Sequence, residues 1–141
     1  MTPAMPEEMA TREAARETIE GYFSAIHAGD TRSLGHLFSP TARLVGWDEG
    51  ELKSVPRDRW LEFVGAIPSP RSQGDPLESE ILDLEVSGTA AVAKVRERYR
   101  NFQYVEFLAL LWIGDRWQIV HKCYHQFARS GPRADGSRGA R

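Results

Sequence analysis

The chain has 141 residues, with 18 basic and 20 acidic side chains and a net charge of −2. This length predicts one domain that buries about two thirds of the surface exposed by the unfolded chain. The near balance of charge gives no electrostatic preference for nucleic acid or for an anionic membrane, so neither is expected as a partner.

The ends of the chain and its cysteine content indicate the compartment. The N-terminal residues show neither a basic start nor an apolar run, so no signal peptide or membrane span is predicted. Cys123 is the single cysteine, which rules out an intrachain disulfide and favours a reducing, cytoplasmic setting. We expect a flexible N-terminus and helix start over residues 1–13, one domain over 14–127, and a disordered Arg/Gly-rich tail over 128–141.

The first predicted element is a long amphipathic helix over Glu7–Ala28. One stripe of apolar side chains recurs at helical spacing and consists of Ala15, Ile19, Tyr22, Phe23 and Ile26. Gly29 is suited to end this helix, and Asp30 is a ready N-cap for the next. That second helix is short, directs Leu34, Leu37 and Phe38 inward, and stops before Pro40.

The middle of the chain alternates short elements with turns. Residues Ala42–Trp47 have the pattern of a strand, and a turn at Asp48–Gly50 leads to a short strand over Glu51–Val55. A third helix is predicted over Pro56–Val64, because proline is well tolerated at a helix start. The Pro-, Ser- and Gly-rich segment Pro68–Pro76 is predicted to be a loop.

Four β-patterned segments with tight turns between them fill the rest of the domain. They are Leu77–Val86, Ala90–Arg100, Phe102–Ile113 and Trp117–Phe127. Helices grouped on one face of an antiparallel sheet predict an α+β fold. We expect a cone-shaped, curved antiparallel sheet wrapped around the long N-terminal helix, with two shorter helices. Such a cone has one open end, which is a natural pocket for a small molecule.

The segment Tyr104–Ile113 is apolar on both of its faces. A strand directs successive side chains to opposite sides, and the helices can cover only one of them. We therefore expect a homodimer through the outer sheet face. The residues assigned to that interface are Val105, Phe107, Leu111, Ile113, Val120 and Tyr124.

Strict alternation along the strands places Glu97, Glu106 and His121 on the concave side. A carboxyl group in a dry pocket has a raised pKa and can share a proton with an imidazole. We hypothesise that Glu97 or Glu106 forms a proton-transfer pair with His121, while Tyr22 donates a hydrogen bond to a developing oxyanion. In the alternative, arginines pair with the glutamates and His121 is a hydrogen-bonded core residue. A one-residue bulge would reverse any of these orientations.

Aromatic residues supply candidate walls for the pocket. Trp47, Trp60 and Trp112 could stack on a flat heterocycle or polyketide, or they could simply fill the core. Tyr99 follows Glu97 on the inward face of its strand, and Asp48 lies near the expected mouth. A structural role for Asp48 in the turn is favoured over contact with a ligand.

A metal site is not predicted. His121, Cys123 and His125 alternate on one strand, where residues two apart are separated by roughly 6.5–7 Å. At most two of them could reach one ion, and no carboxylate spacing completes a tetrahedron. Cys123 is expected to be a small core residue. No cofactor is predicted either.

Several segments carry a family resemblance. Tyr22–Asp30, Leu37–Ala42 and Gly114–Val120 resemble the nuclear transport factor 2-like superfamily. More narrowly, Pro56–Asp58, Pro68–Pro70, Val95–Tyr99 and Leu108–Leu111 resemble its lumazine-binding subgroup. The resemblance runs from Glu17 to His125 and implies the cone fold. This fold hosts isomerases, dehydratases, SnoaL-like polyketide cyclases and non-catalytic dimer modules, so the chemistry must be argued from the site.

Ketosteroid isomerases share this fold and use a carboxylate base with a Tyr-plus-acid oxyanion hole. The resemblance places the tyrosine of that site at Tyr22, the base at Gly46 and the protonated acid at Leu108. Two of the three groups are therefore absent, and standard ketosteroid isomerase chemistry is not expected. The expectation is a cofactor-independent cyclase, dehydratase or isomerase acting on an apolar carbonyl or heterocyclic compound. A non-catalytic ligand-binding protein and a dimerisation module with a filled cone remain alternatives.

Overall fold

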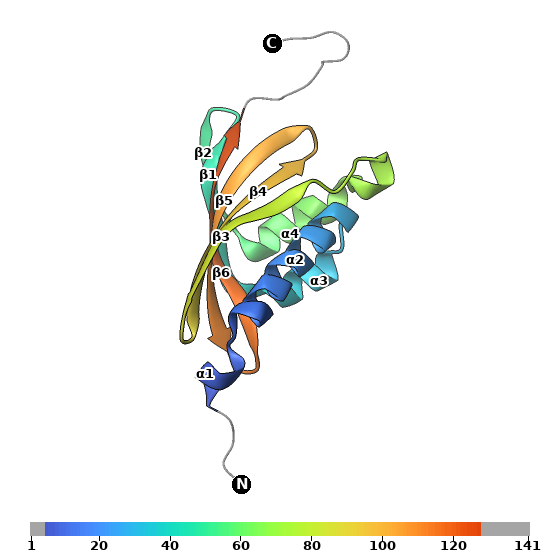
Figure 1. The fold of residues 1–141 in the computed structure, drawn as a ribbon. Coiled ribbons are helices and arrows are strands. Elements are labelled where there is room, and N and C mark those ends of the chain that lie inside the picture. Colours follow the sequence, from blue (N-terminus) through green and yellow to red (C-terminus); the bar gives the residue numbers. More distant parts are fainter. Residues whose placement is uncertain (1–4, 128–141) are drawn as a thin grey trace.

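Six strands form one curved sheet in the computed structural model, and the helices α2, α3 and α4 lie on one side of it (Figure 1). The structure describes residues 5–127. Within that range the helices are α1 (Pro6–Met9), α2 (Arg12–Ala28), α3 (Thr31–Leu37) and α4 (Arg57–Ala66), with a 3₁₀ turn η1 (Arg71–Gln73). The strands are β1 (Phe38–Asp48), β2 (Glu51–Pro56), β3 (Ser79–Ser87), β4 (Ala90–Tyr99), β5 (Phe102–Ile113) and β6 (Arg116–Phe127). The predicted α+β architecture is confirmed.

The apolar spacing predicted one continuous helix from Glu7 to Ala28, but the structure has two helices there. The break lies at Ala10 and Thr11, where the Thr11 hydroxyl accepts a hydrogen bond from the Ala14 amide at 3.1 Å and caps α2. Gly29 ends α2 in the left-handed conformation with a φ of 68°, and Asp30 caps α3, as predicted. The N-terminal region up to residue 13 thus contains α1 and the start of α2. Residues 1–4 and the predicted disordered tail over 128–141 lie outside the described residues.

The sheet has the strand order β2-β1-β6-β5-β4-β3, and one of its pairings is parallel. Strand β1 begins at Phe38, beside Ile119 near the start of β6, and both strands run toward the same end. The predicted wholly antiparallel sheet is therefore a mixed one. Phe38 begins β1 instead of ending the preceding helix, and it is almost fully buried.

The orientation of β6 changes part-way along the strand. Leu110 of β5 is opposite Ile119, whereas its neighbour Ala109 is opposite His121, so Val120 is an extra residue. Such a bulge reverses the direction in which all following side chains point. Trp117 and Ile119 face the helices before it, and Lys122 is the buried residue after it. Strands β4 and β5 keep the predicted alternation as far as Glu97 and Glu106.

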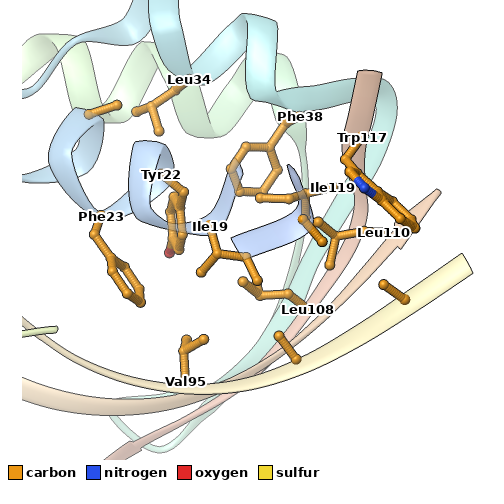
Figure 2. Packing of buried hydrophobic residues seen from close by; sticks show 14 of the residues in the cluster. Ile19, Tyr22, Phe23, Leu34, Phe38, Val95, Leu108, Leu110, Trp117 and Ile119 are labelled. Carbon is orange, nitrogen blue, oxygen red and sulfur yellow. The ribbon is translucent and has the colours of Figure 1, made fainter. Parts of the chain in front are cut away.

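The core lies between α2 and the concave face of the sheet. Figure 2 shows Ile19, Tyr22 and Phe23 of α2 directed toward Val95 and Leu108 of the sheet. The indole nitrogen of Trp117 donates to the Thr11 carbonyl at 3.1 Å and ties β6 to the start of α2. This apolar packing fills one end of the cone. No helix within residues 5–127 is long and apolar enough to cross a membrane.

Helix α4 covers the other end of the concave face. The guanidinium of Arg57, at the start of α4, donates to the carbonyls of Gly35 at 3.0 Å and Phe38 at 3.2 Å. These two bonds fasten α4 to the junction of α3 and β1. One turn later, the Trp60 ring packs on Phe38 with 4.9 Å between ring centroids. Trp60 is thereby held over the polar part of the sheet.

Candidate functional site

A cavity of about 520 Å³ opens between α4 and the half of the sheet that follows the β6 bulge. Its volume lies in the range typical of small-molecule sites. Its floor is polar, and its walls combine aromatic, aliphatic and charged side chains. The lining residues are Ile26, Leu44, Asp48, Lys53, Val55, Arg59, Trp60, Glu62, Phe63, Glu97, Tyr99, Tyr104, Glu106, Lys122 and Tyr124.

The hydroxyl of Tyr22 is the centre of a buried polar cluster at the floor. It lies 2.8 Å from Glu106 Oε1, 3.2 Å from Glu97 Oε2 and 2.9 Å from Lys122 Nζ. The Lys122 ammonium also lies 3.2 Å from Glu106 Oε2. We call Tyr22, Glu97, Glu106 and Lys122 the buried tetrad. All four residues are at most 7 % exposed, so water screens these contacts little.

The three neighbours of the Tyr22 hydroxyl fix the protonation of the tetrad. A phenol has one proton to donate and two lone pairs that accept. The shortest contact assigns the phenolic proton to Glu106, and Lys122 donates to one lone pair. The remaining lone pair faces Glu97, so that contact is a hydrogen bond only if Glu97 carries its own proton. The tetrad therefore contains a neutral Glu97, an ionised Glu106 and a charged Lys122.

The electrostatics of the tetrad lead to the same assignment for Glu97 and Tyr22. Burial raises the pKa of Glu97 well above its ordinary value, and the neighbouring Glu106 carboxylate raises it further, against a smaller lowering by Lys122. Burial and the two carboxylates also raise the pKa of Tyr22, which keeps its phenol neutral. An acid and a carboxylate that meet at one phenolic hydroxyl form an arrangement suited to proton transfer near neutral pH.

Lys122 is surrounded by aromatic rings as well as by oxygen atoms. Its Nζ lies 5.0 Å from the centroid of Trp60, 5.4 Å from Tyr22 and 5.6 Å from Tyr124. The faces of aromatic rings attract cations, so these rings and the Glu106 carboxylate stabilise positive charge at this position. Lys122 also lines the cavity, so a bound molecule can reach it.

Two tyrosines line the cavity beyond the tetrad. Tyr104 accepts a hydrogen bond from the Gln126 side chain at 2.9 Å, and Tyr124 donates to Asp48 at 3.5 Å. Burial raises the pKa of both tyrosines above its ordinary value, and together with the charge of Asp48 it brings the pKa of Tyr124 to about 12. Both phenols are therefore neutral, and they offer a ligand flat apolar surface with polar edges.

Six of the nine residues predicted to form the site lie at the cavity or its floor. Tyr22, Glu97 and Glu106 meet in the tetrad. Trp60, Tyr99 and Asp48 line the cavity.

The other three lie elsewhere. His121 is exposed on the outer face, because the bulge at Val120 reverses β6. Trp47 is 56 % exposed, since Leu44, Gly46 and Asp48 take the inward positions of β1. Trp112 packs edge-on against Trp117 at the filled end of the cone, 6.0 Å between centroids, and does not line the cavity.

The same reversal corrects two further predictions. Tyr124, assigned to the outer dimer face, lies on the concave side and lines the cavity. Cys123, predicted to be a core residue, is exposed. Of the outer-face residues, Phe107 is 47 % exposed, and Leu111 and Ile113 are each 41 % exposed.

Lys122 is the main residue that reading the sequence missed. Two adjacent apolar residues, Ile119 and Val120, were the local signal that alternation was interrupted. A second signal was chemical. Two inward carboxylates need a buried cation or a proton, and Lys122 is the cation that a shifted β6 register would supply.

Gly46 lies on the inward side of β1, where the resemblance to ketosteroid isomerases placed the catalytic base. A Cβ atom at this position would overlap the carbonyl oxygen of Tyr124 and lie 2.7 Å from its ring carbon Cδ1. Glycine is therefore required for the close approach of β1 and β6. No group of three or more His, Cys, Asp or Glu within residues 5–127 is placed to hold a metal ion.

Comparison with known proteins places this geometry in a family. The sequence profile of the family described as "Putative lumazine-binding" matches residues 10–125. The chain belongs to this lumazine-binding family. The match includes the whole tetrad and the cavity-lining strands. The family and the structural neighbours below make the protein a member of the nuclear transport factor 2-like superfamily.

Individual relatives of this lumazine-binding family member are distant. An aldolase, FrzH of Cladobotryum sp, is 24% identical over 110 residues, which cover 77% of this chain and 85% of the aldolase. An NTF2-like protein of unknown function from Silicibacter pomeroyi DSS-3 is 26% identical with a TM-score of 0.70, over 82% of this chain and 94% of that one. A ketosteroid isomerase-like protein from Erwinia carotovora atroseptica SCRI1043 shares the fold at 18% identity and a TM-score of 0.62, over 88% and 99% of the two chains.

Proposed function

We propose that this protein is an enzyme that binds a small, mainly apolar carbonyl compound in the cavity and moves a proton at the carbon beside the carbonyl. The observation that carries the proposal is the pair of carboxyl groups on one phenol, with Glu97 neutral and Glu106 ionised. Two carboxyl groups whose environments hold them in different protonation states can act as acid and base. The reaction belongs to the cofactor-independent cyclase, dehydratase, isomerase or aldol type.

Each member of the tetrad has a distinct role in this proposal. The Glu97 acid, which lines the cavity, protonates the carbonyl oxygen as charge develops on it. The Glu106 carboxylate removes the proton from the neighbouring carbon. Tyr22 holds both carboxyl groups through its hydroxyl, and Lys122 balances the charge of Glu106.

The cavity walls support a flat or cyclic ligand. Trp60, Phe63 and the tyrosines of β4 to β6 provide apolar faces that stack on a planar ring. The name of the aldolase relative supports a carbonyl substrate, and the family description supports a heterocyclic one. An α,β-unsaturated or cyclic ketone satisfies the requirements of both the floor and the walls.

Exchange of hydrogen in D₂O tests this function even while the natural substrate is unidentified. Cyclic and aromatic ketones are incubated with the protein, and deuterium at the carbon beside the carbonyl is followed by NMR. We expect exchange with at least one ketone, reduced by about 10²–10⁴-fold in Glu97→Gln and in Glu106→Gln. His121→Gln is the control, because His121 is exposed on the far face. Exchange that both glutamine variants retain in full would refute the acid–base roles.

A ligand-binding protein without turnover is the second candidate, favoured by the family description. It uses the same cavity, with the tetrad as a set of satisfied structural contacts. It predicts a ketone that binds, shown by calorimetry, and no exchange above the buffer rate. The open volume of 520 Å³ counts against the third alternative, a module whose cone is filled by its own side chains.

We also propose that the outer sheet face forms a two-fold homodimer. Its centre is the apolar group Val105, Phe107, Leu111 and Ile113, with Val120 at the bulge. Tyr124 is not part of this face, because it lines the cavity. Exposed apolar patches of this kind are costly for a monomer. Light scattering at micromolar concentration should give twice the chain mass, and Phe107→Glu should give the monomer mass. A monomeric wild-type protein would contradict this part of the proposal.

A further inference from the structure

Lys122 combines its counter-ion contact with surroundings that this role alone does not require. It lines the cavity, its side chain is 8% exposed, it contacts a carboxylate and a phenol, and three aromatic rings surround it. The other two lysines of the chain, Lys53 and Lys94, are in different settings. Lys53 has a side chain that is 43% exposed, and Lys94 lies on the outer face over Phe107.

We propose that Lys122 is a covalent catalytic residue that forms an imine with the carbonyl carbon of an aldehyde or ketone bound in the cavity. The inference rests on the proposed function and names its substrate class as carbonyl compounds that are open enough for an amine to attack. An amine nucleophile needs a neighbouring base and a proton donor for the leaving oxygen. The Glu106 carboxylate, 3.2 Å from Lys122 Nζ, is the base, and the protonated Glu97 is the proton donor.

The proton inventory of the tetrad balances for this step. The Lys122 ammonium gives a proton to the Glu106 carboxylate, and the free amine then attacks the carbonyl carbon. Glu97 protonates the oxygen, and the new C–N bond leaves a positively charged nitrogen that returns a proton to Glu97. Glu106 then protonates the hydroxyl, which leaves as water. The site begins with an ammonium, a carboxylate and an acid, and it ends with an iminium, a carboxylate and an acid.

The positive charge of the iminium therefore lies where the charge of the Lys122 ammonium lay before the reaction. The rings of Trp60, Tyr22 and Tyr124 and the Glu106 carboxylate attract positive charge near Nζ and stabilise the iminium as they stabilise the ammonium. The iminium withdraws electrons from the neighbouring carbon. Glu106 can then take a proton from that carbon and leave a neutral enamine, which is the nucleophile of an aldol reaction.

Reductive trapping tests the covalent site in the unmodified full chain. The protein is treated with benzaldehyde and sodium cyanoborohydride, which reduces iminium ions faster than aldehydes near neutral pH. Peptide mapping then measures the benzyl adduct at each of the three lysines over time. We expect the adduct at Lys122 to form at least about tenfold faster than those at Lys53 and Lys94. Labelling of Lys122 at the same rate as these two lysines, or slower, overturns the proposal.

Substitution separates the covalent role from the charge of the lysine. Lys122→Arg keeps a cation beside Glu106 but cannot form an imine, and Lys94→Arg is the matched control. We expect Lys122→Arg to lose at least about 100-fold in exchange with the active ketone, with Lys94→Arg unchanged. Circular dichroism checks that both variants fold. Full exchange by Lys122→Arg overturns the imine and leaves the acid–base function standing. Labelling of Lys122 in a wild-type protein that exchanges no ketone leaves the covalent site standing and removes the proton-transfer function.

Discussion

The two halves of β6 differ in what they bury. Before the bulge at Val120, Trp117 and Ile119 pack against α2 and fill one end of the cone with apolar groups. After it, Lys122 and Tyr124 face the same side and meet carboxylates, phenols and an open cavity. The first half gains free energy from burying apolar surface, whereas the second half removes charges from water, which costs stability unless every partner is present.

This difference explains how one strand can contribute to both the core and a functional site. A single inserted residue changes which side chains point inward, so packing at one end does not dictate the chemistry at the other. Substitutions before the bulge should therefore change stability alone. Those after it should change stability, protonation and ligand chemistry together.

The largest effect is expected in the apolar half. Trp117→Ala removes a buried indole and its hydrogen bond to Thr11, which should lower the free energy of unfolding by about 4 kcal/mol. Trp47→Ala is the matched control, because Trp47 is 56 % exposed and should change stability by less than about 1 kcal/mol. Urea denaturation measures both. Equal losses in the two variants would contradict the assignment of Trp117 to the core.

The second largest effect is expected when the ion pair between Lys122 and Glu106 is broken. Glu106→Gln leaves the buried Lys122 ammonium without its counter-ion and should cost about 3 kcal/mol. The double variant Glu106→Gln/Lys122→Met should recover most of that loss, because a buried pair can be replaced by neutral groups at little cost. Glu80→Gln, which removes an exposed ion pair with Arg96, should cost about 0–1 kcal/mol. Additive losses in the double variant would show that the two side chains are not coupled.

A smaller effect should appear in the pH dependence of stability. The pKa of Glu97 is raised in the folded state by burial and by Glu106, so the folded protein holds this proton where the unfolded chain has lost it. Its contribution is full below the ordinary pKa of 4.5 and is lost as the pH rises through the folded value. Wild type should lose up to about 1.4 kcal/mol per pH unit relative to Glu97→Gln across this window. A constant difference between about pH 5 and 8 would mean that Glu97 is ionised in the folded protein.

The smallest effect is expected for His121. His121→Ala should change the free energy of unfolding by less than about 0.5 kcal/mol and leave ketone exchange at the wild-type rate, because the side chain is exposed on the outer face. Denaturation and the D₂O assay measure the two quantities. A loss of exchange would restore His121 to the site and would require a β6 register different from the one observed.

Features that depend on local pattern were predictable from the sequence. Period-two alternation correctly placed Glu97 and Glu106 inward, and helical spacing placed Tyr22 on the buried side of α2. The capping residues Gly29 and Asp30 set the helix boundaries that direct the chain into β1. Three of the four tetrad residues follow from these patterns alone.

The remainder depends on strand pairings that local patterns specify weakly, as at Ile119 and Val120, or not at all. The parallel pairing of β1 with β6 joins segments that are far apart in sequence, so no turn specifies it. The bulge at Val120 is specified by the fit between β5 and β6, without a Gly or Pro to mark it. For that reason the prediction directed His121 inward, whereas the structure directs Lys122 inward. The site therefore contains an amine where the prediction had an imidazole.

The close approach at Gly46 limits how the chemistry of this fold can change over time. A carboxylate there would need a Cβ that overlaps the main chain of Tyr124, so shortening the Tyr124 side chain would not make room for it. A chain with this strand pairing cannot acquire a carboxylate at position 46 by point substitution, and would first have to separate β1 from β6. The backbone itself therefore closes this position to an acid or base and leaves such chemistry to residues on the other strands.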